Sequence, residues 1–96
     1  MHQQVMVTTE SAVSLKPLLE TALQNETKLL SHGIRRTQER LRAFEQQFGM
    51  RSAEFERKFN ARKLDETLDY IDWVMEIKAL AMLKEQYNAL RGARLD

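Results

Sequence analysis

Apolar side chains recur along residues 15–48 at the alternating four- and three-residue intervals of a helical seam. The seam positions are Leu19, Leu23, Leu30, Gly33, Thr37, Phe44 and Phe48. Two intervals of seven residues, Leu23 to Leu30 and Thr37 to Phe44, fit the spacing if Glu26 and Arg40 are also counted as seam positions. Three neighbouring residues widen the apolar stripe: Ala22, Ile34 and Leu41. This pattern predicts one helix with a coiled-coil-like seam. At 1.5 Å per residue the helix would be about 50 Å long, which favours an extended hairpin over a compact globule.

The ends of this long helix are predicted from capping residues. Ser14 is a good N-cap for a helix that begins at Leu15, and Pro17 then falls in the first turn, where its missing N–H has no cost. Gly33, inside the seam, either allows a close helix approach or marks a break. Gly49 is placed to end the helix in a left-handed conformation.

Two further helices are predicted after Gly49. Ser52 caps a short second helix over residues 53–62, and the chain turns at Lys63 and Leu64. Asp65 is the expected N-cap of a third helix over residues 66–90, which Gly92 ends.

The third helix carries apolar residues on two sides. One side holds Tyr70, Trp73, Val74, Ile77, Leu80 and Ala81, and the other holds Leu68, Ile71, Met75 and Met82. A hairpin partner covers only one side, so we expect a second subunit to cover the other. The predicted fold class is therefore all-α: a long helical hairpin with a short middle helix, which dimerises into a four-helix-bundle or coiled-coil-like assembly.

Composition agrees with one helical domain. The chain has 96 residues, with only three glycines and one proline. We expect residues 14–96 to form the domain and residues 1–13 to form a flexible arm, or a short strand that pairs only with a partner. The absence of cysteine excludes disulfides and thiolate metal sites, and no cofactor is predicted.

The net charge of +1 and the lack of an apolar run of about 20 residues predict a soluble protein with no membrane partner. The N-terminal sequence has no basic region followed by a long apolar one, so a cytoplasmic location is expected.

An acidic segment follows a basic one. Four acids in the segment are spaced to form a stripe on the third helix: Asp65, Asp69, Asp72 and Glu76. The stripe is either a solvated face, a docking face for a basic partner or a carboxylate site for a divalent cation. No histidine has the spacing that helical di-metal sites use, so no metal site is predicted.

The preceding basic segment, residues 35–63, suggests contact with nucleic acid as an alternative function. Its cationic residues are Arg35, Arg36, Arg40, Arg42, Arg51, Arg57, Lys58, Arg62 and Lys63. All four phenylalanines lie in the same segment, but their i, i+4 spacing points each pair inward instead of forming a stacking platform. The alternative is that these charged side chains have no binding role and only keep the protein soluble.

The phenylalanines are predicted to build a structural corner. Phe44 and Phe48 close the long helix, Gly49 turns the chain, and Phe55 and Phe59 fold back from the second helix. Trp73 is expected to anchor this core, with its indole N–H needing one partner.

Catalysis has no support in the sequence. No nucleophile is paired with a base, no phosphate-binding glycine loop is present, and His2 and His32 have no ligand-like spacing. The chain is therefore not predicted to be an enzyme.

The stretch "FEQQFGMRSAEFERKF" with the later "LDETLDYIDWVMEIKAL" resembles a group of small, all-helical prokaryotic proteins. The residues that carry the resemblance are Glu45, Phe48, Gly49, Met50, Phe55, Lys58, Phe59 and Trp73. One departure is Arg51, which stands where that pattern has Ser or Thr, with Ser52 next. Some members of the group are encoded beside toxins, so the resemblance implies an antitoxin-like role and no catalytic residue.

Together these features predict a homodimeric helical interaction protein that binds and neutralises a protein partner, such as a toxin encoded nearby. The acidic stripe and the N-terminal arm would bind the partner, since a tail that orders on binding suits regulation. The alternatives are a nucleic-acid-associated regulator and a purely structural homo-oligomer.

Overall fold

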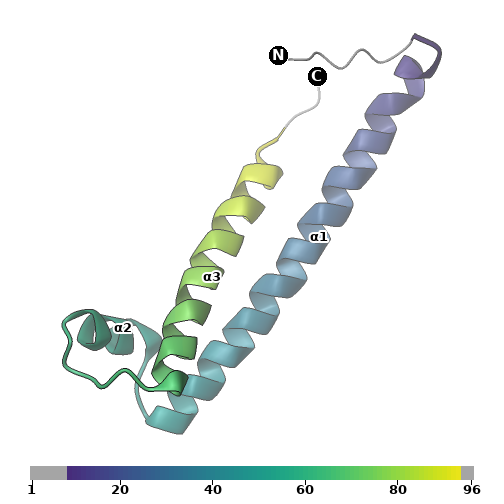
Figure 1. Cartoon of the computed structure of the whole chain (residues 1–96). Coiled ribbons are helices and arrows are strands. Elements are labelled where there is room, and N and C mark those ends of the chain that lie inside the picture. Colours follow the sequence, from purple (N-terminus) through teal and green to yellow (C-terminus); the bar gives the residue numbers. More distant parts are fainter. Residues whose placement is uncertain (1–8, 94–96) are drawn as a thin grey trace.

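The computed structural model describes residues 9–93 as three helices and contains no strand within that range. Helix α1 spans Thr9–Phe48, α2 spans Ser52–Asn60 and α3 spans Leu68–Arg91 (Figure 1). Helices α1 and α3 lie side by side as an antiparallel hairpin, and α2 lies across the turn. The all-α hairpin predicted from the sequence is confirmed.

Helix α1 begins earlier than the capping pattern predicted. Its backbone is helical from Thr9, so Ser14 lies inside the helix and does not cap it, and Pro17 lies beyond the first turn. Proline in a helix interior removes one backbone hydrogen bond and disturbs the preceding turn, but α1 continues past Pro17 to Phe48. Of the predicted arm, residues 9–13 belong to α1, and residues 1–8 lie outside the described residues.

The molecule is elongated. The radius of gyration is 19.6 Å, against roughly 12–13 Å for a compact domain of this length. The longest dimension is 61 Å, because α1 has 40 residues and α3 has only 24, so α1 extends well past the end of α3 (Figure 1). The predicted extended hairpin is confirmed.

The seam between α1 and α3 follows the predicted spacing with a different phase. Glu26 and Arg40 are exposed, and Thr27 and Leu41 take their places facing α3, while Leu19 is 44% exposed. The buried or half-buried positions that make up this seam on α1 are Leu23, Thr27, Leu30, Ile34, Thr37, Leu41, Phe44 and Phe48. On α3 they include Tyr70, Trp73, Ile77, Leu80, Leu83, Tyr87 and Leu90.

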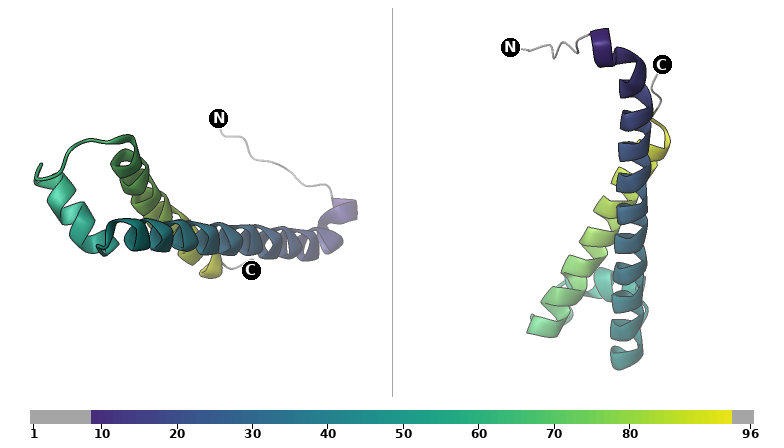
Figure 2. Two further views of the ribbon diagram at one scale, coloured as in Figure 1. Left: turned by 90° about the horizontal axis from the view of Figure 1, so that it is seen from below. Right: turned by 90° about the vertical axis from the view of Figure 1, so that its right-hand side faces the viewer.

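The hairpin is wedge-shaped. Helix α3 is inclined to α1, and the two diverge toward the turn, where α2 lies (Figure 2). The wide end is filled by the core of Leu41, Phe55 and Trp73. Nearer the narrow end, Gly33 faces the Leu83 side chain. Helix α1 runs unbroken through Gly33, so the suggestion of a helix break there was wrong.

The loops before α2 and α3 differ in detail from the prediction. Gly49 has a φ of 62°, which confirms the expected left-handed turn after α1. Arg62, with a φ of 59°, makes a second left-handed turn beyond α2. The N-cap of α3 is Thr67, whose hydroxyl accepts a hydrogen bond from the Tyr70 backbone N–H, so the prediction of Asp65 as the cap was wrong. Thr67 is the N-cap instead of Asp65 because it lies three residues before a backbone N–H in the first turn that has no partner within the helix.

Candidate partner-binding surface

The corner that joins α1 to α2 is held by a side chain from the preceding helix. The N-cap residue of α2 is Arg51, which makes no side-chain capping bond, and Ser52 is the first helical residue instead of the cap. The Glu45 carboxylate accepts a 2.8 Å hydrogen bond from the Ser52 backbone N–H. This bond lowers the pKa of Glu45, and the positive charges of Arg51 and Arg42 lower it further. A carboxylate at this end of a helix satisfies a free N–H and complements the helix dipole.

Trp73 is the centre of the aromatic core. Its indole is fully buried and stacks on Phe55, with Phe44 and Phe48 at centroid distances of 5.5 and 5.7 Å. Its Nε1–H donates a 2.9 Å hydrogen bond to the Ser52 hydroxyl. The predicted anchor with one polar partner is confirmed, and Ser52 serves the core instead of the helix cap.

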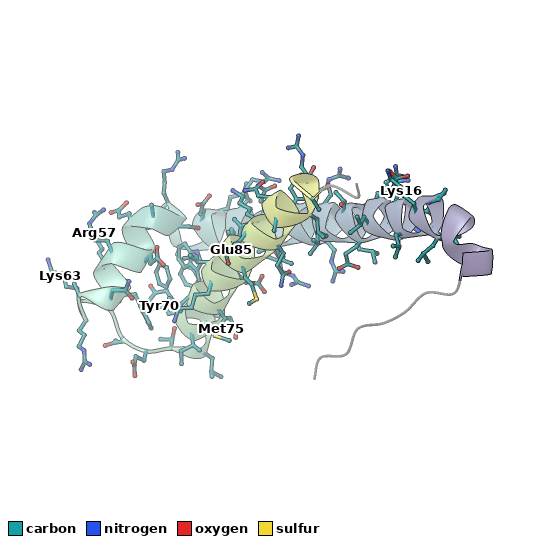
Figure 3. All side chains as sticks on the ribbon, turned by 90° about the horizontal axis from the view of Figure 1, so that it is seen from above. Lys16, Arg57, Lys63, Tyr70, Met75 and Glu85 are labelled. Carbon is teal, nitrogen blue, oxygen red and sulfur yellow. The ribbon has the colours of Figure 1, made fainter. Side chains whose placement is uncertain are left out.

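The residues of the corner therefore have structural roles. Tyr70 also lies between α2 and α3, where its ring meets those of Phe48 and Phe55 (Figure 3). Phe59 is half-buried against the core, as predicted. The aromatic side chains of the corner are thus used to join α1, α2 and α3.

The acidic stripe is shorter than predicted. Asp65 lies in the loop before α3, so only Asp69, Asp72 and Glu76 are on the helix. Glu76 is half-buried and forms an ion pair with Arg40, with 3.3 Å between Nη1 and Oε2. Asp65, Asp69 and Asp72 are exposed. Among the side chains of residues 15–93, the ion pairs are this one and Lys58–Glu54, so these three carboxylates have no cationic partner there.

Beside the acids runs a row of uncovered apolar side chains on the outer side of α3. Leu68 is 81% exposed, Met75 60% and Met82 56%, and Ile71 is also exposed. The prediction that α3 is apolar on two sides is confirmed, since α1 and α2 cover only the side that holds Trp73. An apolar row next to free carboxylates is typical of a protein-binding surface.

A shallow groove of about 430 Å³ lies between α1 and α3 on the same side of the hairpin. Phe44, Ala43 and Gln47 line it from α1, and Met75 from α3. The Arg40–Glu76 pair also lines it, so both signs of charge border an apolar floor.

A second hollow of about 370 Å³ lies outside the corner, lined by Glu45, Gly49, Met50, Arg51 and Glu54 among others. It is open, and its carboxylate already accepts the Ser52 N–H. We therefore assign it to the capping of α2.

The basic residues proposed to contact nucleic acid do not share one surface. Arg35 and Arg42 are seven residues apart and lie on one side of α1, whereas Arg36 and Arg40 lie on another. Arg57 and Lys63 project away from the rest of the molecule at the far end of α2 (Figure 3). Arg51 and Arg62 are exposed, and Lys58 pairs with Glu54.

Among the side chains of residues 15–93, no three His, Cys, Asp or Glu residues are grouped so that they could hold a metal ion. His32 is exposed on α1, and His2 lies outside the described residues. No helix in the described part of the chain combines the length and apolar character needed to cross a membrane.

Searches of protein-family models, curated proteins and solved structures found no match to this chain. The residues that carry the resemblance noted above therefore have to be interpreted from their geometry. Glu45, Gly49, Phe55 and Trp73 all belong to the corner, where they cap α2, turn the chain and fill the core. The pattern therefore consists of residues that build this corner. The antitoxin-like role that the resemblance suggested stays a prediction.

Proposed function

We propose that this protein is a non-enzymatic interaction protein that binds a partner protein through the turn end of α3. The observation that carries the proposal is Leu68, which is 81% exposed. The exposed carboxylates of Asp65, Asp69 and Asp72 flank it in the sequence. We call these four residues the acidic end of α3.

The composition of the acidic end defines the partner that fits it. An exposed leucine favours an apolar pocket or a helix face on the partner, and three carboxylates without cationic partners favour Lys or Arg around that pocket. Asp69 also lies in the first turn of α3, where it complements the helix dipole.

In its most specific form the proposed function is antitoxin-like, so that binding neutralises a toxic partner. The resemblance of the corner supports this form. The proposed functional unit is a homodimer in the cytoplasm, since α3 leaves apolar side chains uncovered on its outer side. Nucleic-acid binding by the basic segment is less favoured, because its residues are divided between different sides of α1.

The proposal is tested by co-expressing the tagged chain with the product of an adjacent gene. A complex should survive purification at moderate salt, and co-expression should relieve any growth arrest that the partner causes alone. The double variant Asp69→Lys, Asp72→Lys should weaken the complex by about tenfold or more, because it brings like charges together. The matched control is Glu85→Lys, an exposed acid nearer the other end of α3, which should bind normally. If neighbouring gene products form no complex, or if both variants bind as the wild type does, the proposal is wrong.

A further inference from the structure

Helix α1 carries a second seam in addition to the one that faces α3. Its positions are Leu15, Leu18, Ala22, Asn25 and Leu29. The intervals are three, four, three and four residues, which is the spacing of a coiled-coil seam. Leu18 and Leu29 are 64% and 65% exposed, and Ala22 and Asn25 are exposed as well. Leu15 is half-buried, and the other four positions of the seam are uncovered within the described residues.

Most of the second seam lies beyond the reach of α3. Gly33 faces Leu83, and α3 ends at Arg91, eight residues after Leu83. Eight residues before Gly33 is Asn25, so α1 extends past α3 over the residues that precede Asn25 in an antiparallel pair. Lys16 marks this extension in Figure 3. An isolated amphipathic extension of this kind gains most of its stability from packing.

The second seam continues onto the groove between α1 and α3. Leu29 precedes Arg40 by eleven residues, which is about three helical turns, so both lie on nearly the same side of α1. Arg40 and Met75 line the groove together. Met82 is two turns from Met75 along α3, on the same side. One face of the hairpin therefore holds Leu18, Leu29, Met75 and Met82, all more than half exposed.

The exposed area of the chain is large enough to supply such an interface. The accessible surface is 7677 Å², whereas a compact monomer of 11.3 kDa would expose about 5,700 Å². The excess is larger than the roughly 800 Å² that each partner contributes to a standard interface.

We propose that a second copy of this chain covers this face, with the two α1 helices parallel and the two-fold axis along the length of the hairpin. The extensions of both α1 helices then lie at the same end and cover each other's Leu18, and the two Leu29 side chains meet beside the hairpins. In this arrangement the two Asn25 side chains face each other, and each amide supplies a donor and an acceptor to the other. In an antiparallel pair centred on Ala22, Asn25 would instead face Leu18 or Leu19.

Charge complementarity supports the same arrangement. The Arg40–Glu76 pair shows that these residues lie at the same level along the hairpin. A two-fold axis along the hairpin preserves that level, so Arg40 of one copy comes to the level of Glu76 of the other. Two heptads of α1 alone are too short for a stable coiled coil, so the interface has to include this part of the face with Met75 and Met82.

This inference rests on the homodimer of the proposed function and adds its geometry, and the experiment uses the absence of cysteine from the whole sequence. Single variants Ala22→Cys and Asn25→Cys should each form an intersubunit disulfide under mild oxidation, because equivalent seam residues meet at the axis of a parallel pair. The matched control is Gln24→Cys, exposed on the opposite side of α1. We expect about tenfold more covalent dimer from each seam variant than from the control. If only one seam variant cross-links, the pair is antiparallel and the proposal is overturned, while the homodimer stands.

Sedimentation separates the remaining outcomes. The wild-type chain should sediment as a dimer at tens of micromolar. The variant Leu18→Glu, Leu29→Glu should sediment as a monomer with unchanged helix content, since neither side chain supports the single chain. The control Glu20→Lys changes an exposed charge on the side of α1 opposite the second seam and should remain dimeric. A wild-type monomer would overturn both the homodimer and its geometry, but would not affect binding at the acidic end of α3. A Leu18→Glu, Leu29→Glu variant that remains dimeric would overturn the geometry alone.

Discussion

The ring of Phe55 lies parallel to the indole of Trp73, with 3.9 Å between the ring centroids, 2° between the planes and no exposed surface on either side chain. This contact joins α2 to α3. Helix α2 has nine residues, which is too short to be stable by itself in water. The burial of its phenylalanine side chains is therefore the main source of stability for α2.

Truncation of Phe55 to alanine should lower the free energy of unfolding by about 3–5 kcal/mol, because it removes a fully buried ring and leaves a cavity beside Trp73. Urea denaturation followed by circular dichroism measures the change. The control is Ile71→Ala, on the exposed side of α3, which should cost much less. A near-neutral Phe55 variant would show that the ring is accessible in solution, and the corner would again be a candidate binding site.

The capping bond of Glu45 should make stability depend on pH. The pKa of Glu45 is lowered in the folded chain, chiefly by the Ser52 backbone N–H. A depressed carboxyl pKa stabilises the fold above the unfolded-state value, near 4.5, and this contribution is lost as pH falls through the folded pKa. At pH 7 the variant Glu45→Gln should therefore be less stable than the wild type, and at pH 3 the two should converge.

A second glutamate, Glu56 on α2, provides the control for the Glu45 prediction. Glu56→Gln removes a carboxylate from α2 that makes no capping bond among the described residues. Its difference from the wild type should be small at both pH values. A Glu45→Gln deficit that persisted unchanged at pH 3 would mean that the charge of the cap is not what stabilises α2.

The conformation of Gly49 predicts a cost for any side chain at this position. A Cβ there would meet nothing within 4 Å, but the φ of 62° is strained for other residues. Gly49→Ala should therefore lose about 1–2 kcal/mol through backbone strain alone, and Gly49→Asn should lose less. Gly92→Ala is the control, because Gly92 has a φ of −85° and ordinary contacts, and it should be neutral or slightly stabilising. Equal effects at both glycines in thermal denaturation would contradict this account.

The helical hairpin and its corner were predictable from local patterns. The spacing of apolar residues gave the helix type, the clustered phenylalanines indicated the corner, and Gly49 has no side chain to oppose a left-handed turn. Trp73 was recognisable as an anchor because an indole is large and has one donor. Its partner was not, since Ser52 meets Trp73 only when α2 folds back, and its local spacing suggested a helix cap instead.

The phase of the α1 seam could not be predicted locally. Helix α1 carries two seams at the same spacing, so the sequence fits more than one choice of facing side. The inclination of α3 decides in favour of Thr27 and Leu41 over Glu26 and Arg40. The capping role of Glu45 could not be predicted from local sequence either, because its carboxylate reaches a helix that begins seven residues later.

Gly33 gives the clearest chance to stabilise the fold. It lies in the interior of α1, where glycine is less favourable than alanine by about 1 kcal/mol. A Cβ at this position would lie 3.5 and 3.8 Å from the δ carbons of Leu83, which is ordinary contact. Gly33→Ala should therefore raise the free energy of unfolding by about 0.5–1 kcal/mol, as measured by urea denaturation at a concentration where sedimentation has fixed the association state. Gly33→Ile, whose branches would have to displace Leu83, should instead destabilise. If Gly33→Ala also destabilised the chain, the two helices would have to approach more closely at this point than the Leu83 contact indicates.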